Sequence, residues 1–76
     1  MNCELFKKLM KEIGIDLGIS SVYTFGKKRI TIDIEVDVNN ESIIFCSAII
    51  EDVEYKSSIT TKNAMEFINF IKFVKK

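Results

Sequence analysis

The sequence predicts a two-layer α+β domain in which two helices pack on one face of an antiparallel meander of three or four strands, in the order α-β-β-β-α. An amphipathic helical pattern stands at each end of the chain, and residues 30–38 alternate between β-branched apolar and polar side chains. Helices that flank a set of consecutive strands are typical of the two-layer class. With 76 residues, the chain has room for one domain, residues 1–76.

The first helix is predicted over residues 2–13. Asn2 can cap its N-terminus, and Gly14 follows the last apolar position, as is typical of the residue after a helix. At about 100° per residue, the apolar side chains form one arc and the charged side chains the opposite arc. The apolar arc contains Cys3, Leu5, Phe6, Leu9, Met10 and Ile13.

Two strands and a tight turn are predicted next. Residues 22–25 form a short strand, and Gly26 with Lys27 and Lys28 forms a hairpin turn, since glycine tolerates positive φ. The alternation from Ile30 to Val38 predicts a strand with one buried and one solvated face. Asn39 and Asn40 predict the turn that follows, because asparagine adopts left-handed backbone geometry more readily than other non-glycine residues.

The third strand, residues 42–51, is apolar on both faces, and its register is left open by the sequence. With a two-residue turn, the side chains that share a face with Asp33, Glu35 and Asp37 are Ile44, Cys46, Ala48 and Ile50. With a three-residue loop, they are Ile43, Phe45 and Ile49. Either register places apolar side chains beside acidic ones on the face away from the helices.

A weaker strand is predicted over residues 53–60, with Val53 and Tyr55 on one side. The last helix is predicted over residues 62–74, where Asn63 and Glu66 have the spacing of a capping box. Its apolar arc contains Ala64, Phe67, Ile68, Phe70, Ile71 and Val74, and Met65 and Phe73 lie outside that arc.

The composition excludes several kinds of chemistry. The chain has no histidine, so it lacks the usual general base and the commonest metal ligand, and its serines have no histidine to activate them. Cys3 and Cys46 are far apart, without the spacing of a zinc site. No phosphate-binding glycine motif, signal peptide or membrane-spanning run is present. We therefore expect a non-enzymatic cytoplasmic protein with free thiols and without a metal or cofactor.

Charge is strongly segregated although the formal net charge is zero. Between Arg29 and Lys56 there are seven carboxylates and no basic residue. Carboxylates on alternate strand positions lie about 6.5–7 Å apart, close to the phosphate repeat of a nucleic-acid strand, and an exposed apolar patch usually marks an interface. The sequence therefore predicts a partner-binding face, with a protein partner that has a basic, nucleic-acid-binding surface. The residues predicted for it are Asp33, Glu35, Asp37, Ile44, Cys46 and Ile50.

Basic residues form a second candidate site, for nucleic acid. The α-β-β-β-α order resembles that of double-stranded-RNA-binding domains, and this resemblance implies contacts from the first helix, the first hairpin loop and the start of the last helix. The last helix departs from the family, because it has one lysine where the family has a cluster. The residues that match these three regions are Lys7, Lys8, Lys11, Lys27, Lys28, Arg29 and Lys62.

The sequence thus predicts a protein-binding module that acts through an acidic and apolar sheet face. The abundance of Ile, Lys and Asn, with a single Arg and no Pro, suits an AT-rich microbe or its phage. Small chains of that origin are often inhibitors of a host complex, anti-CRISPR proteins included. Two alternatives remain, an RNA-binding-like module and a homo-oligomer in which the apolar column pairs with its own copy.

Overall fold

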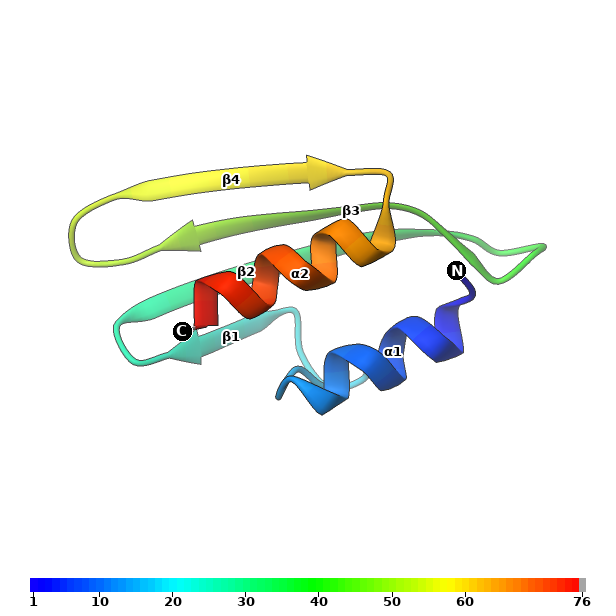
Figure 1. Ribbon diagram of the computed structural model, residues 1–76, viewed down its shortest axis with the longest axis horizontal. Helices are drawn as coiled ribbons and strands as arrows, with labels where there is room; N and C mark the ends of the chain where they lie inside the picture. Colours follow the sequence, from blue (N-terminus) through cyan, green and yellow to red (C-terminus); the bar gives the residue numbers. More distant parts are fainter. Residues whose placement is uncertain (76) are drawn as a thin grey trace.

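The computed structural model describes residues 1–75 and has the element order α-β-β-β-β-α (Figure 1). The four strands form one antiparallel sheet in the order β1-β2-β3-β4, and both helices lie on the same face of it. This confirms the predicted two-layer α+β class and shows that the meander has four strands. The elements are α1 (Cys3–Glu12), β1 (Val22–Phe25), β2 (Lys28–Asp37), β3 (Ser42–Glu51), β4 (Lys56–Thr61) and α2 (Ala64–Lys75).

Helix α1 is one residue shorter at each end than the predicted range 2–13, and the residues predicted at its two ends have the expected roles. The Leu5 N–H donates to Asn2 Oδ1 at 2.8 Å, so Asn2 is the N-cap. At the other end Gly14 has a φ of +91°, and the N–H groups of Gly14 and Ile15 donate to the carbonyls of Lys11 and Met10. This pair of hydrogen bonds is a Schellman motif, and it turns the chain so that Ile15 is fully buried.

The first hairpin has a two-residue loop, because Phe25 pairs with Lys28. Gly26 has a φ of +62°, and Lys27 is not among the residues with positive φ. A positive φ at the first loop position alone is the pattern of a type II′ turn, which matches the twist of the strands.

The second hairpin has neither of the two predicted loop lengths, but from Phe45 onward its faces are those predicted for the three-residue loop, with Phe45 and Ile49 on the side of Asp33 and Glu35. Its loop has four residues, Val38–Glu41, since Asp37 pairs with Ser42. The residue in left-handed geometry is Glu41, with a φ of +52°, so the prediction that Asn39 and Asn40 take this role is wrong. The Asp37 carboxylate closes the loop by accepting hydrogen bonds from the Asn39 N–H (3.0 Å) and Asn40 Nδ2 (2.9 Å).

A β-bulge then shifts the register within β3. Val36 pairs with Ile43, but the next pair is Glu35 with Phe45, so Ile44 is the extra residue. The shift puts Cys46, Ala48 and Ile50 on the helix-covered face, where their side chains are at most 1% exposed. The acidic residues instead share their face with Phe45, Ser47 and Ile49.

The last hairpin and helix are shorter than predicted. Residues 52–55 form a loop and β4 begins at Lys56, so the strand expected from residue 53 is wrong at its start. The Asp52 side chain holds this loop by accepting from the N–H groups of Glu54 (2.9 Å) and Tyr55 (2.8 Å). Helix α2 is capped by Asn63, which accepts from the Met65 and Glu66 N–H groups, and Thr61 Oγ1 accepts from the Asn63 N–H.

The core lies between the helices and the inner face of the sheet. Phe6 of α1 and Phe67 of α2 are fully buried, with ring centroids 6.2 Å apart, and so join the two helices over the sheet. Met65 and Phe73 are 44% and 76% exposed, as their positions outside the predicted arc indicated. The buried set is Phe6, Met10, Ile15, Ile30, Ile32, Cys46, Ala48, Ile50, Ala64, Phe67, Ile68 and Ile71.

Candidate functional site

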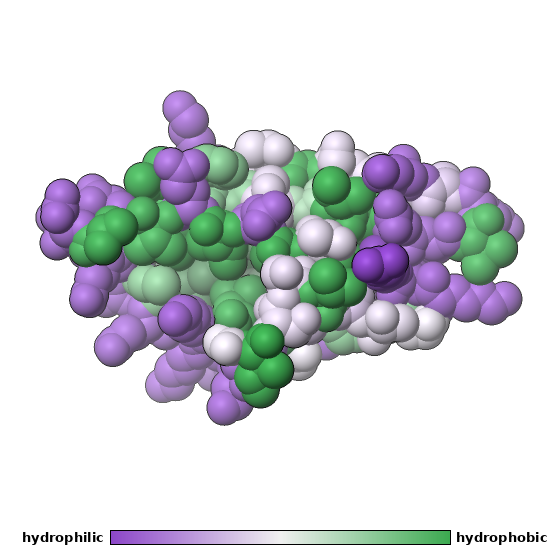
Figure 2. Space-filling view, turned by 180° about the vertical axis from the view of Figure 1, so that it is seen from behind, coloured by the Kyte–Doolittle hydropathy of each residue, from purple (hydrophilic) through white to green (hydrophobic). Residues whose placement is uncertain are grey.

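The sheet has a second face that neither helix covers (Figure 1). We call it the outer face and define it as the strand residues that alternate with the buried ones. Figure 2 views the molecule from this side, where apolar surface is interspersed with the near-neutral surface of serine and threonine, and hydrophilic surface gathers mostly toward the two ends. The outer face consists of Val22, Thr24, Arg29, Thr31, Asp33, Glu35, Phe45, Ser47, Ile49, Glu51, Lys56, Ser58 and Thr60.

The middle of the outer face is apolar and rich in hydroxyl groups. One row across the strands runs Val22, Thr31, Ile49 and Ser58, and Val22 and Ile49 are 38% and 40% exposed. Large β-branched side chains at such positions keep substantial apolar area in water, which burial against another surface would remove. Serine and threonine beside them can donate and accept hydrogen bonds across an interface.

One end of the outer face is acidic. Asp33 pairs with Ser47 and Glu35 with Phe45, and both carboxylate residues are exposed. These four residues line an open hollow of about 320 Å³, together with Ile34. The acidic end therefore combines two free carboxylates with an aromatic side chain and a hydroxyl group.

The other end carries charges of both signs, with a basic excess. Arg29 pairs with Glu51, and Glu51 pairs with Lys56 on the next strand. Lys56 Nζ lies 3.5 Å from Glu51 Oε1 in an exposed ion pair. Two cations and one anion lie in this row, opposite in net sign to the acidic end.

The predicted partner-binding residues are only partly brought together. Asp33 and Glu35 lie on the outer face, and Ile44 is 44% exposed at the bulge. The prediction that Cys46 and Ile50 belong to this surface is wrong, because the bulge turns both into the core. Burial raises the pKa of the Cys46 thiol to about 11, so it stays protonated at neutral pH.

Asp37 is also not a free carboxylate of the outer face, because it is hydrogen-bonded in the neighbouring loop. Its carboxylate accepts hydrogen bonds within the loop of residues 38–41. These bonds lower its pKa, and the largest contribution comes from the Asn40 side chain, followed by the Asn39 N–H. The regular run of three carboxylates expected from the sequence is therefore reduced to the pair Asp33 and Glu35.

The predicted basic residues lie on separate parts of the molecule. Lys7, Lys8 and Lys11 are exposed on α1, and residues 27–29 lie at the first hairpin turn. Lys28 Nζ donates to the Val74 carbonyl at 2.7 Å, which places this turn beside the C-terminus of α2. Lys62 precedes the N-terminus of the same helix, which is 12 residues or about 18 Å long.

The fourth strand is the reason for this separation. In an α-β-β-β-α order the last helix begins at the same end of the sheet as the first hairpin turn, and an added strand moves that beginning to the opposite end. The structure thus does not bring Lys62 together with Lys27 and Lys28 as the resemblance to double-stranded-RNA-binding domains implies.

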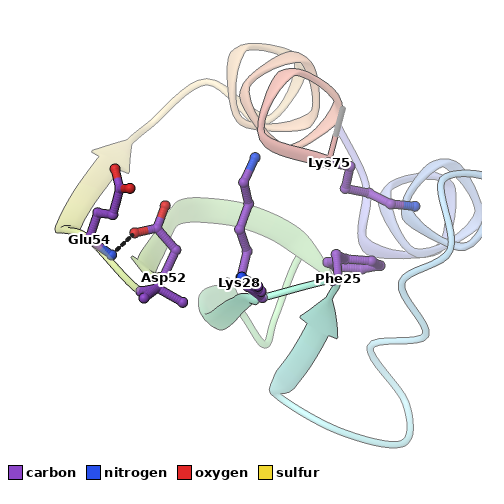
Figure 3. A pocket seen from close by; sticks show the side chains of 8 residues that line it. Phe25, Lys28, Asp52, Glu54 and Lys75 are labelled. Atoms are coloured by element: carbon purple, nitrogen blue, oxygen red, sulfur yellow. Dashed lines mark hydrogen bonds between the residues drawn. The ribbon is translucent and has the colours of Figure 1, made fainter.

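A cleft that the sequence did not predict lies at the end of the sheet that carries the first hairpin turn and the loop of residues 52–55 (Figure 3). It is open, measures about 610 Å³, and Lys28 stands between Asp52 and Glu54 on one side and Phe25 and Lys75 on the other. Lys75 Nζ lies over the Phe25 ring, 4.6 Å from its centroid. Two backbone N–H groups of its own loop, with the charge of Lys28, lower the pKa of Asp52. The charged groups here have structural roles, since Lys28 joins the first hairpin turn to the end of α2 and Asp52 holds the loop of residues 52–55.

Other kinds of site have no support within residues 1–75. No group of three or more potential ligand residues is arranged to hold a metal ion, and no buried side-chain nitrogen or oxygen lacks a hydrogen-bond partner. None of the helices described combines the length and the apolar character needed to cross a membrane. Comparison of the chain with protein-family models, curated proteins and solved structures gives no significant match.

Proposed function

We propose that this protein is a non-enzymatic protein-binding module whose interface is the outer face of its sheet. One observation carries the proposal: a four-stranded sheet has both helices on one side, and its other side presents half-exposed apolar side chains beside two free carboxylates. Antiparallel sheets often have one solvated face, but such a face is typically polar. Apolar side chains at its centre favour an interface over a merely solvated surface.

The pattern of side chains across this face is that of a protein interface. Ile49 and Phe45 supply apolar contact, and the hydroxyl and charged residues around them can form polar contacts at the margin. An inhibitor of a host nucleic-acid-binding complex, as expected from the sequence, is one form of this function. That form requires the Asp33 and Glu35 end to face a basic surface, because the two negative charges then assist association.

The test is a comparison of two double variants with the same change in charge. D33K/E35K reverses the acidic end of the outer face, and E4K/E12K makes the same reversal on exposed positions of α1. Each variant, with the wild type, is used as bait in lysate of the source organism with and without nuclease, after circular dichroism has shown that it is folded.

We expect the wild type and E4K/E12K to retain the same protein partner after nuclease treatment, and D33K/E35K to lose it. Equal capture by both double variants would overturn the proposal. Capture that disappears with nuclease would replace it with nucleic-acid binding through the lysines, which should then weaken steeply as salt increases.

A further inference from the structure

The two ends of the outer face differ in charge, and their spacing along one strand is regular. Arg29, Asp33 and Glu35 are on the same side of β2, and Arg29 and Glu35 are six residues apart, or about 20 Å. Lys56 reinforces the basic end. The midpoint between the two ends lies at the level of Ile32, whose partner on β3 is Ala48, the residue before the apolar Ile49.

This arrangement is complementary to itself under one particular rotation. A two-fold axis in the plane of the interface and perpendicular to the strands stacks two outer faces with their strands antiparallel. Arg29 of each copy then lies opposite Glu35 of the other, since a two-fold contact is always made twice. A two-fold axis along the strands would instead stack Arg29 end on Arg29 end and the acidic end on itself, which like-charge repulsion disfavours.

The area suits a weak, reversible complex. Strands of 4, 10, 10 and 6 residues, about 4.8 Å apart and rising about 3.3 Å per residue, give a face of roughly 475 Å². Two such faces bury roughly 950 Å² in total, which is in the range of weak, transient interfaces. Sheets that pack face to face do so at about 10 Å, a distance that arginine and glutamate side chains can bridge from opposite sheets.

We infer that the partner of the outer face is a second copy of this chain, stacked sheet to sheet with antiparallel strands and joined at both ends by Arg29–Glu35 ion pairs. Ile49 and Phe45 fill the space between the two sheets. A second copy fits better than a basic partner, because the face carries charges of both signs and each end finds its opposite. The inference rests on the proposed function, since it assigns a partner to the same face.

Sedimentation velocity from about 1 to 200 μM tests it, the range in which an interface of this size is expected to dissociate. We expect the mass to rise from 8.7 kDa to twice that value. R29E alone and E35R alone should each weaken dimerisation at least about tenfold, because each change acts twice in a symmetric dimer. The double variant R29E/E35R should recover the wild-type affinity, and a mixture of the two single variants should form a heterodimer.

The matched control is K8E, the same loss of a cation on the exposed side of α1, and it should dimerise as the wild type does. A monomer at 200 μM would overturn the inference, as would a dimer that R29E and K8E weaken equally or that R29E/E35R fails to restore. If the chain is monomeric but D33K/E35K still loses a foreign protein, the proposed function stands and only the second copy is refuted. If neither a dimer nor a foreign partner depends on the outer face, both proposals fail.

Discussion

The two faces of β3 show how neighbouring residues of one strand reach opposite environments. Cys46, Ala48 and Ile50 point toward the helices and are at most 1% exposed, while Ile49, between two of them, is 40% exposed. The composition of the strand is almost the same on both sides, so hydrophobicity alone does not decide which set forms the core. The bulge at Ile44 decides it. A regular ladder continued from the Val36–Ile43 pair would turn Phe45 and Ile49 toward the helices, and the extra residue reverses this.

The largest predicted effect is that of deleting one residue of β3. Without Ile44, Val36–Ile43 and Glu35–Phe45 become consecutive pairs of a regular ladder, and every later side chain keeps its face. Without Ser47, a regular ladder forms only if Phe45 and Cys46 exchange faces, so Cys46 leaves the core and Phe45 enters it. We expect the Ile44 deletion to keep nearly the stability of the wild type and the Ser47 deletion to lose about 2–5 kcal/mol, the cost of a displaced core side chain.

Thermal unfolding followed by circular dichroism measures this difference. Both variants lack one residue from the same strand, so each is the control for the other. Unfolding of both, or folding of the Ser47 deletion with unchanged stability, would contradict the role assigned to the bulge.

Truncation of two adjacent isoleucines, one on each face of β3, should give a smaller difference between the two variants. Ile50→Ala removes a fully packed side chain and should lower the free energy of unfolding by about 2–5 kcal/mol, with Ile50→Val near 1 kcal/mol. Ile49→Ala removes a side chain that is already 40% exposed and should cost less than about 1 kcal/mol.

Urea unfolding gives both values, provided the protein concentration is low enough to keep the chain monomeric, since dimer formation would add to the apparent stability. A larger loss for Ile49→Ala than for Ile50→Ala would reverse the assignment of the two faces.

Local signals in the sequence predicted most of the fold. Asn2, Gly14, Gly26 and Asn63 each act at the turn or helix end where their chemistry placed them, because capping and positive φ are properties of single residues. The register of the second hairpin was not predictable in this way. It depends on Glu41 in a left-handed conformation and on the bulge at Ile44, and neither residue type signals these roles.

The unpredicted register also explains the errors in the candidate site. Asp33 and Glu35 were placed correctly because the alternation of β2 has one reading, whereas Cys46 and Ile50 were assigned to the surface through the wrong register. The link between Lys28 and the end of α2 was also missed, since residues 46 positions apart meet only through the added fourth strand.

The last prediction concerns the part of the pH dependence of stability that comes from Cys46, on the inner face of the sheet. Burial raises the pKa of the Cys46 thiol from its ordinary value of 9.0 to about 11. Between these two values the unfolded chain has lost the thiol proton and the folded chain has kept it, so the unfolded state binds fewer protons. The contribution of this residue to stability is therefore complete below about pH 9 and falls as the pH rises toward 11.

Urea titrations at pH 8 and pH 10.5 measure this slope, and Cys46→Ala should flatten it relative to the wild type. Cys3→Ala is the matched control, because it removes the other thiol of the chain, which is half-buried on α1. The Cys3 variant should keep the wild-type slope. A slope that persists in Cys46→Ala and disappears in Cys3→Ala would place Cys46 on the accessible side of β3, and the bulge would then no longer account for which face of this strand is the core.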